Sequence, residues 1–266
     1  MIDRFGRTIN YLRISVTDRC NLRCRYCMPE EGVKFLDHSD ILSFEEVADV
    51  VRCAVDKGVN KVRLTGGEPL VRRRIAKLVE SIASIKGVAD FAMTTNGTLL
   101  AEHAQALADA GLKRINVSLD TMNPERYRVL TRCGRLEDCL AGIAAAMKVG
   151  LYPVKLNCVV GRFSTADDVQ SVKDFGGSAG LEVRLIRQMV FETGCFSVVE
   201  GGSGGDCLRC NRLRLLSNGD IRPCLFSDMS FNIRTLGVNQ AIKAALARKP
   251  QSGGPCTHNM MYRIGG

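Results

Sequence analysis

The sequence predicts an α/β fold in which six parallel strands alternate with helices, as an incomplete barrel or as a doubly wound sheet. Two observations support this prediction. Six short segments rich in aliphatic and β-branched residues alternate with amphipathic helical patterns over the first two thirds of the chain. Hydrophobic residues make up 45% of the 266 residues, which suits a buried core. In either architecture, ligands collect at the C-terminal ends of the strands.

The predicted elements follow one another in a regular order. The strands are expected at residues 11–17, 61–67, 91–97, 114–120, 153–160 and 181–189. The helices are expected from Ser43 onward and near residues 72–86, 101–110, 124–149 and 165–179. Ser43 and Glu46 have the spacing of a capping box, which marks the start of the first helix.

The pattern changes after residue 189, which suggests three parts. Residues 1–189 form the expected incomplete (β/α)6 barrel, residues 190–206 a short glycine-rich linker, and residues 207–266 a C-terminal region. Within that region we expect a hairpin over residues 212–226, turning at Asn218 and Gly219, and a last helix near residues 238–248.

The net charge and the hydropathy pattern indicate which kinds of partner and location the protein can have. The net charge of +9 and the pI of about 9.1 favour an anionic partner, such as a nucleotide triphosphate, a membrane surface or a nucleic acid. No compact block of five or six like charges occurs, which argues against a nucleic-acid arm. No run of about eighteen apolar residues is present and residues 1–10 lack a signal-peptide core, so we expect a cytoplasmic protein without a membrane span.

Three cysteines directly follow the first predicted strand. Cys20, Cys24 and Cys27 lie within eight residues, and a reducing cytoplasm makes metal or redox chemistry a better explanation than disulfides. A structural zinc site normally takes four protein ligands, so this set is one ligand short. A [4Fe–4S] cube held through three irons would leave its fourth iron open. Zinc completed from elsewhere, or unligated thiols, are the alternatives.

A second triplet lies in the C-terminal region. Cys207, Cys210 and Cys224 again supply three thiols, and the predicted hairpin bridges the last two. A zinc site would need a fourth ligand, for which His258 is the candidate in this region. A second open cluster facing the first would place a substrate between two irons, and a zinc site stays the alternative. The other six of the twelve cysteines are explained as small buried apolar residues.

The spacing of the first triplet and the "GGEP" segment at residues 66–69 together resemble the radical S-adenosylmethionine superfamily. This resemblance implies that the open iron binds S-adenosylmethionine and that the reduced cluster cleaves its sulfonium bond to a 5′-deoxyadenosyl radical. It also implies a set of cosubstrate contacts. These fall on Tyr26, Gly67, Glu68, Thr94 and Ser118.

Longer motifs resemble a narrower family, the GTP 3′,8-cyclases that begin molybdenum cofactor biosynthesis. They are "YLRISVTDRCNLRCRYCMP", "VRLTGGEPLVR", "NVSLDTMNPERY", "CNRLRL", "PCLF" and the terminal Gly265 and Gly266. The resemblance implies two [4Fe–4S] clusters, GTP as substrate with its guanine on the second cluster, and 3′,8-cyclo-7,8-dihydroguanosine triphosphate as product. It also implies an external electron donor, cyclic pyranopterin monophosphate synthase as the next enzyme, and a possible homodimer.

Basic residues on the predicted strands suit a triphosphate. Lys61 and Arg63 are two residues apart, as are Arg212 and Arg214, so each pair projects from one face of its strand. Point charges and bidentate donors both suit phosphate oxygens. By the resemblance, seven residues match positions that bind GTP. They are Arg13, Lys61, Arg63, Lys155, Arg184, Arg212 and Arg214.

The chain also departs from that family. The resemblance implies several dozen more residues between the sixth strand and the second triplet than residues 190–206 provide. Gly201 to Gly205 have the composition of a flexible linker, either spliced or natural. Arg187 stands where an acidic residue is usual. Two other functions stay open: a radical enzyme acting on a peptide or another nucleotide, and a metal-stabilised basic protein that binds RNA.

Overall fold

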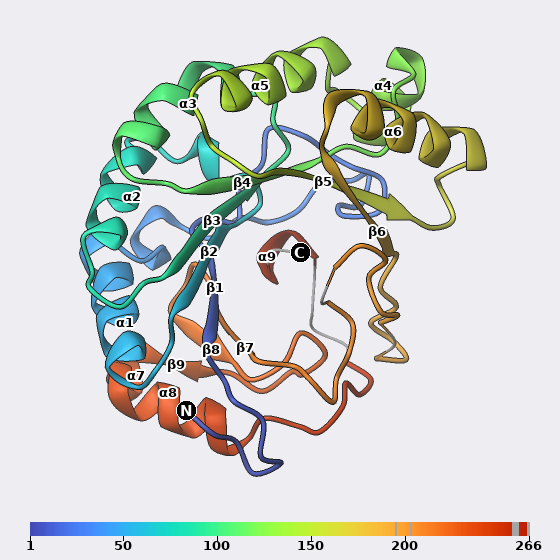
Figure 1. Cartoon of the computed structure of the whole chain (residues 1–266). Coiled ribbons are helices and arrows are strands. Elements are labelled where there is room, and N and C mark those ends of the chain that lie inside the picture. The colour runs from blue at the N-terminus through green and yellow to red at the C-terminus, as the bar shows by residue number, and fades with distance from the viewer. Residues whose placement is uncertain (195, 203, 257–260, 265–266) are drawn as a thin grey trace.

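The computed structural model describes residues 1–194, 196–202, 204–256 and 261–264. Nine strands form one sheet in the order β6-β5-β4-β3-β2-β1-β7-β8-β9, and this sheet curls into an open barrel (Figure 1). Neighbouring strands from β1 to β6 are parallel. Their bounds are β1 Tyr11–Ser15, β2 Lys61–Thr65, β3 Asp90–Thr95, β4 Arg114–Ser118, β5 Val154–Val160 and β6 Glu182–Arg187.

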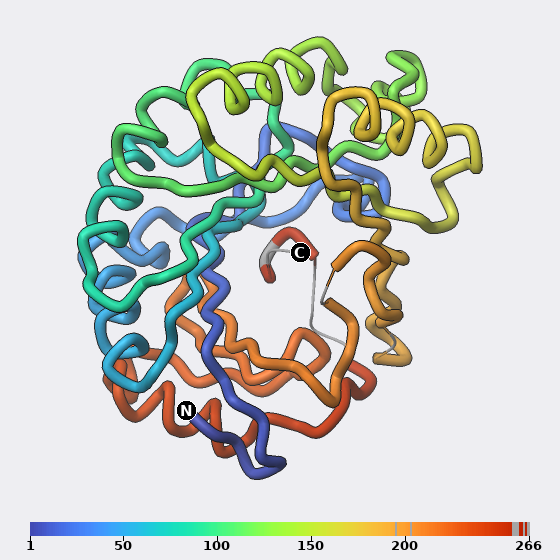
Figure 2. The backbone as a smooth tube through the Cα atoms, viewed as in Figure 1, coloured from blue at the N-terminus to red at the C-terminus, as the bar shows by residue number. Residues whose placement is uncertain are grey.

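Six helices cover the outer face of these strands, so the barrel prediction is confirmed over the doubly wound alternative (Figure 2). Their bounds are α1 Phe44–Asp56, α2 Ile75–Ala83, α3 Leu100–Asp109, α4 Pro124–Thr131, α5 Leu136–Lys148 and α6 Ala166–Ala179. The predicted capping box is confirmed at α1, where the Ser43 Oγ accepts from Glu46 N at 3.1 Å and Glu46 Oε2 accepts from Ser43 N at 2.7 Å. In the described part of the chain, every helix is too short or too polar to cross a bilayer.

The prediction of one helical pattern over residues 124–149 is wrong at its centre. Arg132 has a φ of +66°, a left-handed conformation that ends α4 and separates it from α5. A non-glycine residue holds this conformation only where its surroundings fix it. The Arg132 guanidinium donates to Arg23 O at 2.8 Å and to Met28 O at 2.9 Å. These long-range hydrogen bonds offset the strain of the positive φ at Arg132. The hydrophobic pattern of the two helices does not predict this break.

The C-terminal region extends the same sheet. The predicted hairpin is confirmed, because β7 (Arg212–Leu215) pairs antiparallel with β8 (Asp220–Arg222) and Gly219 supplies a φ of +90° in the turn. β7 also pairs in parallel with β1, which the sequence did not predict. The remaining elements are β9 Phe231–Asn232, α7 Ile233–Leu236, α8 Val238–Ala247, α9 Met261–Ile264, and the 3-10 turns His38–Asp40 and Pro69–Val71. The three-part division stays a prediction, and strands on both sides of the linker share one sheet.

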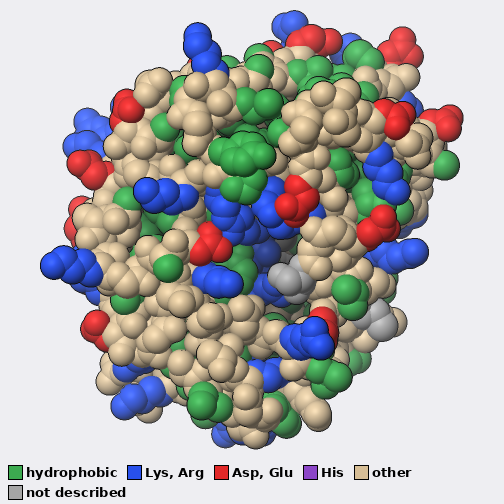
Figure 3. Space-filling model, viewed as in Figure 1, with side chains coloured by type: hydrophobic (Ala, Val, Ile, Leu, Met, Phe, Trp, Pro, Cys, Tyr) green, Lys and Arg blue, Asp and Glu red, His purple; other side chains and the backbone are tan. Residues whose placement is uncertain are grey.

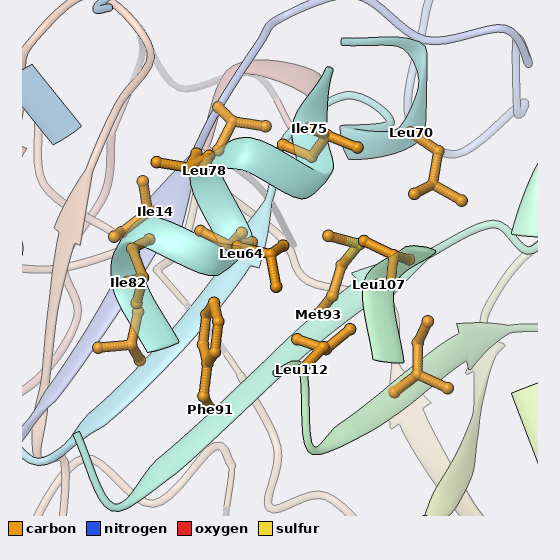
Figure 4. Packing of buried hydrophobic residues seen from close by; sticks show 14 of the residues in the cluster. Ile14, Leu64, Leu70, Ile75, Leu78, Ile82, Phe91, Met93, Leu107 and Leu112 are labelled. Carbon is orange, nitrogen blue, oxygen red and sulfur yellow. The ribbon is translucent and has the colours of Figure 1, made fainter. Parts of the chain in front are cut away.

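Strand residues alternate between an apolar outer face and a polar inner face. On the outer side Ile14, Leu64 and Met93 pack against Leu78 of α2 and Leu107 of α3 (Figure 4). Barrels of this kind usually fill the interior with layers of branched apolar side chains. Here the inward positions of β1, β2 and β7 carry mostly charged residues. The interior is therefore suited to a polar ligand rather than to a packed core.

Candidate active site

A cavity of about 830 Å³ opens at the C-terminal ends of the barrel strands. Its wall contains the whole first cysteine triplet and every residue that the sequence assigned to the cosubstrate. These are Cys20, Cys24, Cys27, Tyr26, Gly67, Glu68, Thr94 and Ser118. Four different strand ends bring them together, because parallel strands place these ends at one edge. The short helix α9 lies inside the barrel and adds Met261 and Tyr262 to the wall (Figure 1).

The loop that carries the first triplet is anchored on the end of α4. Arg23 N donates to Thr131 O at 3.1 Å and Arg25 N to Leu130 O at 3.0 Å, and the Arg132 guanidinium binds two carbonyls of the loop. Within the loop, Cys27 N donates to Cys24 O at 2.9 Å. The cysteines are therefore held on a fixed backbone before any ligand binds.

Glycines 66 and 67 let the end of β2 pack directly on that loop. A Cβ atom on Gly67 would lie 2.3 Å from Arg19 O, well inside van der Waals contact. Gly67 N donates to Thr17 O and Glu68 N to Arg19 O, both at 2.8 Å. Gly66 and Gly67 line the cavity, and their backbone carbonyls can accept hydrogen bonds from a ligand that enters it.

Replacing Gly67 with alanine is expected to displace the cluster loop and to lower iron incorporation at the first triplet. The added methyl meets backbone atoms that cannot move without shifting residues 17–19. Iron analysis after anaerobic reconstitution measures the effect. Gly177→Ala is the matched control, because nothing lies within 4 Å of its added Cβ and it stands within α6. Equal iron contents in the two variants would contradict this role of Gly67.

Glu68 stabilises the wall of the cavity through the hydrogen bonds that its carboxylate accepts. Its side chain is buried, and its oxygens accept from Thr95 Oγ1 at 2.6 Å, Asn96 N at 2.7 Å and Leu70 N at 3.0 Å. Burial raises the pKa of Glu68 to about 7 despite these bonds. Three donors hold the carboxylate, so its direct effect is to fix the end of β3 beside the cysteines.

Asp120, the last residue of the strand expected at residues 114–120, lines the cavity but was not among the site residues that the sequence predicted. Asp120 Oδ2 accepts from the Tyr26 hydroxyl at 2.8 Å, and Oδ1 accepts from Val159 N at 2.7 Å. Burial raises the pKa of Asp120 to about 6. Tyr26 thus has a fixed orientation in the cavity wall. The available signal was the position of Asp120 directly after the fourth strand.

The first triplet places three thiols in one cavity wall, the number that holds a [4Fe–4S] cube through three of its irons. In the described residues no three His, Cys, Asp or Glu side chains converge tightly enough to hold one ion. A cube distributes three thiolates over three irons, so its ligands stand farther apart. Cys20 Sγ accepts from Leu22 N at 3.4 Å and Asn96 Nδ2 at 3.8 Å. Burial raises the pKa of Cys20 to about 11 and that of Cys27 to about 12, and bound iron would favour the thiolate forms.

The second triplet flanks the hairpin that joins the barrel at β1. Cys210 N donates to Cys207 O at 3.2 Å, and Arg7 Nη1 donates to the same carbonyl at 2.7 Å, which ties this turn to the N-terminal segment. Burial raises the pKa of Cys224. The zinc candidate His258 lies outside the described residues.

Five of the seven predicted phosphate ligands lie deeper in the barrel, on β1, β2 and β7. Arg63, Arg13 and Arg214 stand opposite one another on three adjacent strands, and Lys61, Tyr11 and Arg212 form the parallel row two residues earlier. Lysine and arginine side chains also gather at the hollow in the centre of the face shown in Figure 3. Burial lowers the pKa of Arg13 to about 9 and that of Arg63 to about 10. Keeping such cations buried together is costly unless an anion joins them.

Among the described residues that line the cavity, none is one of these seven cations. Thr65 of β2 does line the cavity, and Arg63 precedes it by two residues on the same face, about 7 Å deeper. Lys155 and Arg184, which we expected to bind phosphate, form ion pairs within the protein instead. Both contact Glu182, at 2.5 Å from Lys155 Nζ and 2.8 Å from Arg184 Nε. The sequence did not predict this role of Glu182. If a phosphate group replaced the Glu182 carboxylate as the ionic partner, Lys155 and Arg184 would both be available to bind that phosphate.

Asn116 is a second residue that the sequence reasoning missed. Its side chain is fully buried, it pairs in register with Thr94 and Lys155, and neither its Nδ2 nor its Oδ1 has a partner among the described residues. An unsatisfied buried amide costs about 1–3 kcal/mol. The alternation of Arg114, Asn116 and Ser118 along one inward face was the available signal. A polar ligand in the lumen would satisfy this amide.

The fold and the cavity define a class of enzyme, which comparison with known proteins supports. A family model described as the radical SAM superfamily matches residues 14–176, and the chain belongs to that superfamily. Two solved structures share the fold: Streptococcus suis SuiB bound to S-adenosylmethionine (TM-score 0.63, 18% identity, 85% of this chain and 63% of that one) and native anSMEcpe with bound AdoMet (0.65, 16%, 91% and 81%).

More similar sequences identify the family within that superfamily. The GTP 3′,8-cyclase of Petrotoga mobilis is 38% identical, over 95% of this chain and 94% of the relative, and that of Pelotomaculum thermopropionicum is 40% identical, over 94% of each. The chain belongs to the GTP 3′,8-cyclase family. The first alignment spans 304 positions, whereas the chain has 266 residues, so the relative carries residues that this chain lacks. This agrees with the shortening that the sequence suggested.

Proposed function

We propose that the chain converts GTP and S-adenosylmethionine into (8S)-3′,8-cyclo-7,8-dihydroguanosine 5′-triphosphate, the first step of molybdopterin cofactor biosynthesis. One observation supports this most directly. A single barrel lumen holds the triplet cavity at the strand ends and, about 7 Å deeper, the row of buried arginines. A nucleotide with its triphosphate on the arginines would extend its ribose toward the cavity.

The cosubstrate side depends on residues that are already fixed. When bound, a cluster on Cys20, Cys24 and Cys27 supplies the electron that cleaves S-adenosylmethionine. Tyr26, oriented by Asp120, and the carbonyls of Gly66 and Gly67 would position that cosubstrate. Thr94 and Ser118 line the same wall and would contact it from β3 and β4.

The substrate side depends on charge. We propose that Arg13, Arg63 and Arg214 bind the triphosphate together with Lys61 and Arg212, and that Lys155 and Arg184 join them when Glu182 releases both. Guanidinium groups offer bidentate donors to phosphate oxygens, and a low local dielectric strengthens each contact. The orphaned amide of Asn116 lies in register with Thr94 of the cavity wall, where a ribose hydroxyl could both donate and accept.

The second triplet completes the proposal. Cys207, Cys210 and Cys224 would hold a second [4Fe–4S] cluster that ligates the guanine. We also propose a cytoplasmic enzyme that takes electrons from an external donor, passes its product to cyclic pyranopterin monophosphate synthase, and forms a homodimer. Residues 1–189 would act as the radical domain, 190–206 as the linker and 207–266 as the second-cluster region.

Anaerobic reconstitution followed by incubation with reductant, S-adenosylmethionine and GTP tests this function. We expect about eight irons per chain, release of 5′-deoxyadenosine only with GTP, and the cyclised triphosphate in the mass spectrum. ATP in place of GTP is the control and should release little 5′-deoxyadenosine. Nucleotide-independent release would favour a peptide or another substrate. Zinc in place of iron, with steeply salt-dependent RNA affinity, would favour the RNA-binding alternative.

A further inference from the structure

Lys249 is a buried lysine that neither the motifs nor the proposed reaction explains. It lies two residues after the end of α8, and it is 1% exposed. A buried ammonium is costly unless its protons and its charge are compensated. None of the ion pairs between described residues includes Lys249. The buried ammonium of Lys249 must therefore be stabilised by hydrogen-bond acceptors other than carboxylates.

Three acceptors surround the Lys249 Nζ. They are Arg212 O at 2.7 Å, Pro223 O at 2.9 Å and Cys210 Sγ at 3.4 Å. An ammonium has three protons to donate, whereas a neutral amine has two, so this set of partners selects the charged form. The two carbonyls account for two protons, and the third points at a sulfur of the second triplet.

The position of this ammonium joins both parts of the second triplet. Arg212 follows Cys210 by two residues, and Pro223 directly precedes Cys224. Lys249 thus connects the turn that carries the first two cysteines to the segment that carries the third. Cys20 of the first triplet differs, because its hydrogen bonds come from two uncharged donors, Leu22 N and Asn96 Nδ2.

We propose that Lys249 is a positioning residue that orients Cys210 and raises the reduction potential of the cluster held by the second triplet. The inference rests on the proposed second cluster. Three thiolates around a [4Fe–4S] core give a net negative charge, which increases by one on reduction. A buried cation bonded to a ligand sulfur stabilises the reduced form more than the oxidised form, and hydrogen bonds and net charge are known determinants of such potentials.

The test compares Lys249→Met, which removes charge and donors, with Lys249→Gln, which keeps amide donors but is neutral. Both are made in the full chain carrying Cys24→Ala, so that the second cluster alone contributes to an EPR-monitored redox titration. Lys243→Met is the matched control, since Lys243 is an exposed lysine on α8.

We expect both Lys249 variants to keep about four irons per chain. At the midpoint of the parent, their ratio of reduced to oxidised cluster should fall about tenfold, which is about 59 mV for one electron. Lys243→Met should titrate with the parent. Unchanged titration at full iron content would overturn the proposal, as would loss of iron from both variants, which would make Lys249 a structural strut. A parent background without iron would instead contradict the proposed second cluster.

Discussion

Replacing Cys24 with alanine is expected to abolish cleavage of S-adenosylmethionine and to reduce the iron content from about eight to about four per chain. Cys24 lies in the cavity wall, and burial holds its pKa well above the ordinary value, so a cysteine at this position has little chemistry without bound iron. Two remaining thiols hold a cube poorly, and they leave no defined open iron. The measurements are iron and sulfide analysis, and 5′-deoxyadenosine by chromatography.

The control for this variant is Cys133→Ala. Cys133 is exposed, so the expectation that it is buried was wrong. It contacts Asn21 O at 3.5 Å, beside the same loop, yet it belongs to neither triplet. It should retain the iron and the activity of the parent. If Cys24→Ala keeps eight irons, the first cluster is held by other residues. If parent and variant carry only zinc, the proposed radical chemistry is wrong for both.

The sequence predicted the composition of the cavity well, for a reason that lies in the fold. Cys20, Glu68, Asn96 and Asp120 each follow a different strand, and parallel strands align their C-terminal ends at one edge of the barrel. Knowing the strand order along the chain is then enough to know which residues meet. The motif spacings located the cysteines, and the barrel topology brought the other residues to them.

Other features depended on contacts that local pattern does not encode. The pairing of β7 with β1 aligns Arg214 with Arg13, and no periodicity in either segment specifies its partner. The break at Arg132 depends on carbonyls about a hundred residues away. Glu182 was missed because its role follows from the register between β5 and β6, which places it opposite Lys155.

Replacing Arg63 with methionine is expected to weaken GTP binding about 10- to 100-fold, because a charge-assisted hydrogen bond contributes about 1.5–3 kcal/mol. The same change should stabilise the ligand-free protein. Burial, together with the like charges of Arg13, Arg114 and Arg184, lowers the pKa of Arg63 to about 10. A base whose pKa falls on folding destabilises the folded state fully at every pH below its folded pKa. The gain is therefore complete at pH 7, begins to fall as pH rises past about 10, and is lost only near the ordinary pKa of an arginine.

Two measurements separate these effects. Calorimetric titration with GTP gives the affinity, and thermal unfolding without ligand gives the stability, where about 1 kcal/mol corresponds to about 2–4 °C for a chain of this size. The lost cation–π contact between Arg63 and the Tyr11 ring opposes the gain only partly, because Arg212 stays 5.5 Å from the same ring. Arg73→Met, an exposed arginine before α2, is the control and should change neither quantity. A variant with lower ligand-free stability and unchanged GTP affinity would mean that Arg63 supports the fold, and that the cost of burying these arginines is met within the protein rather than by a bound triphosphate.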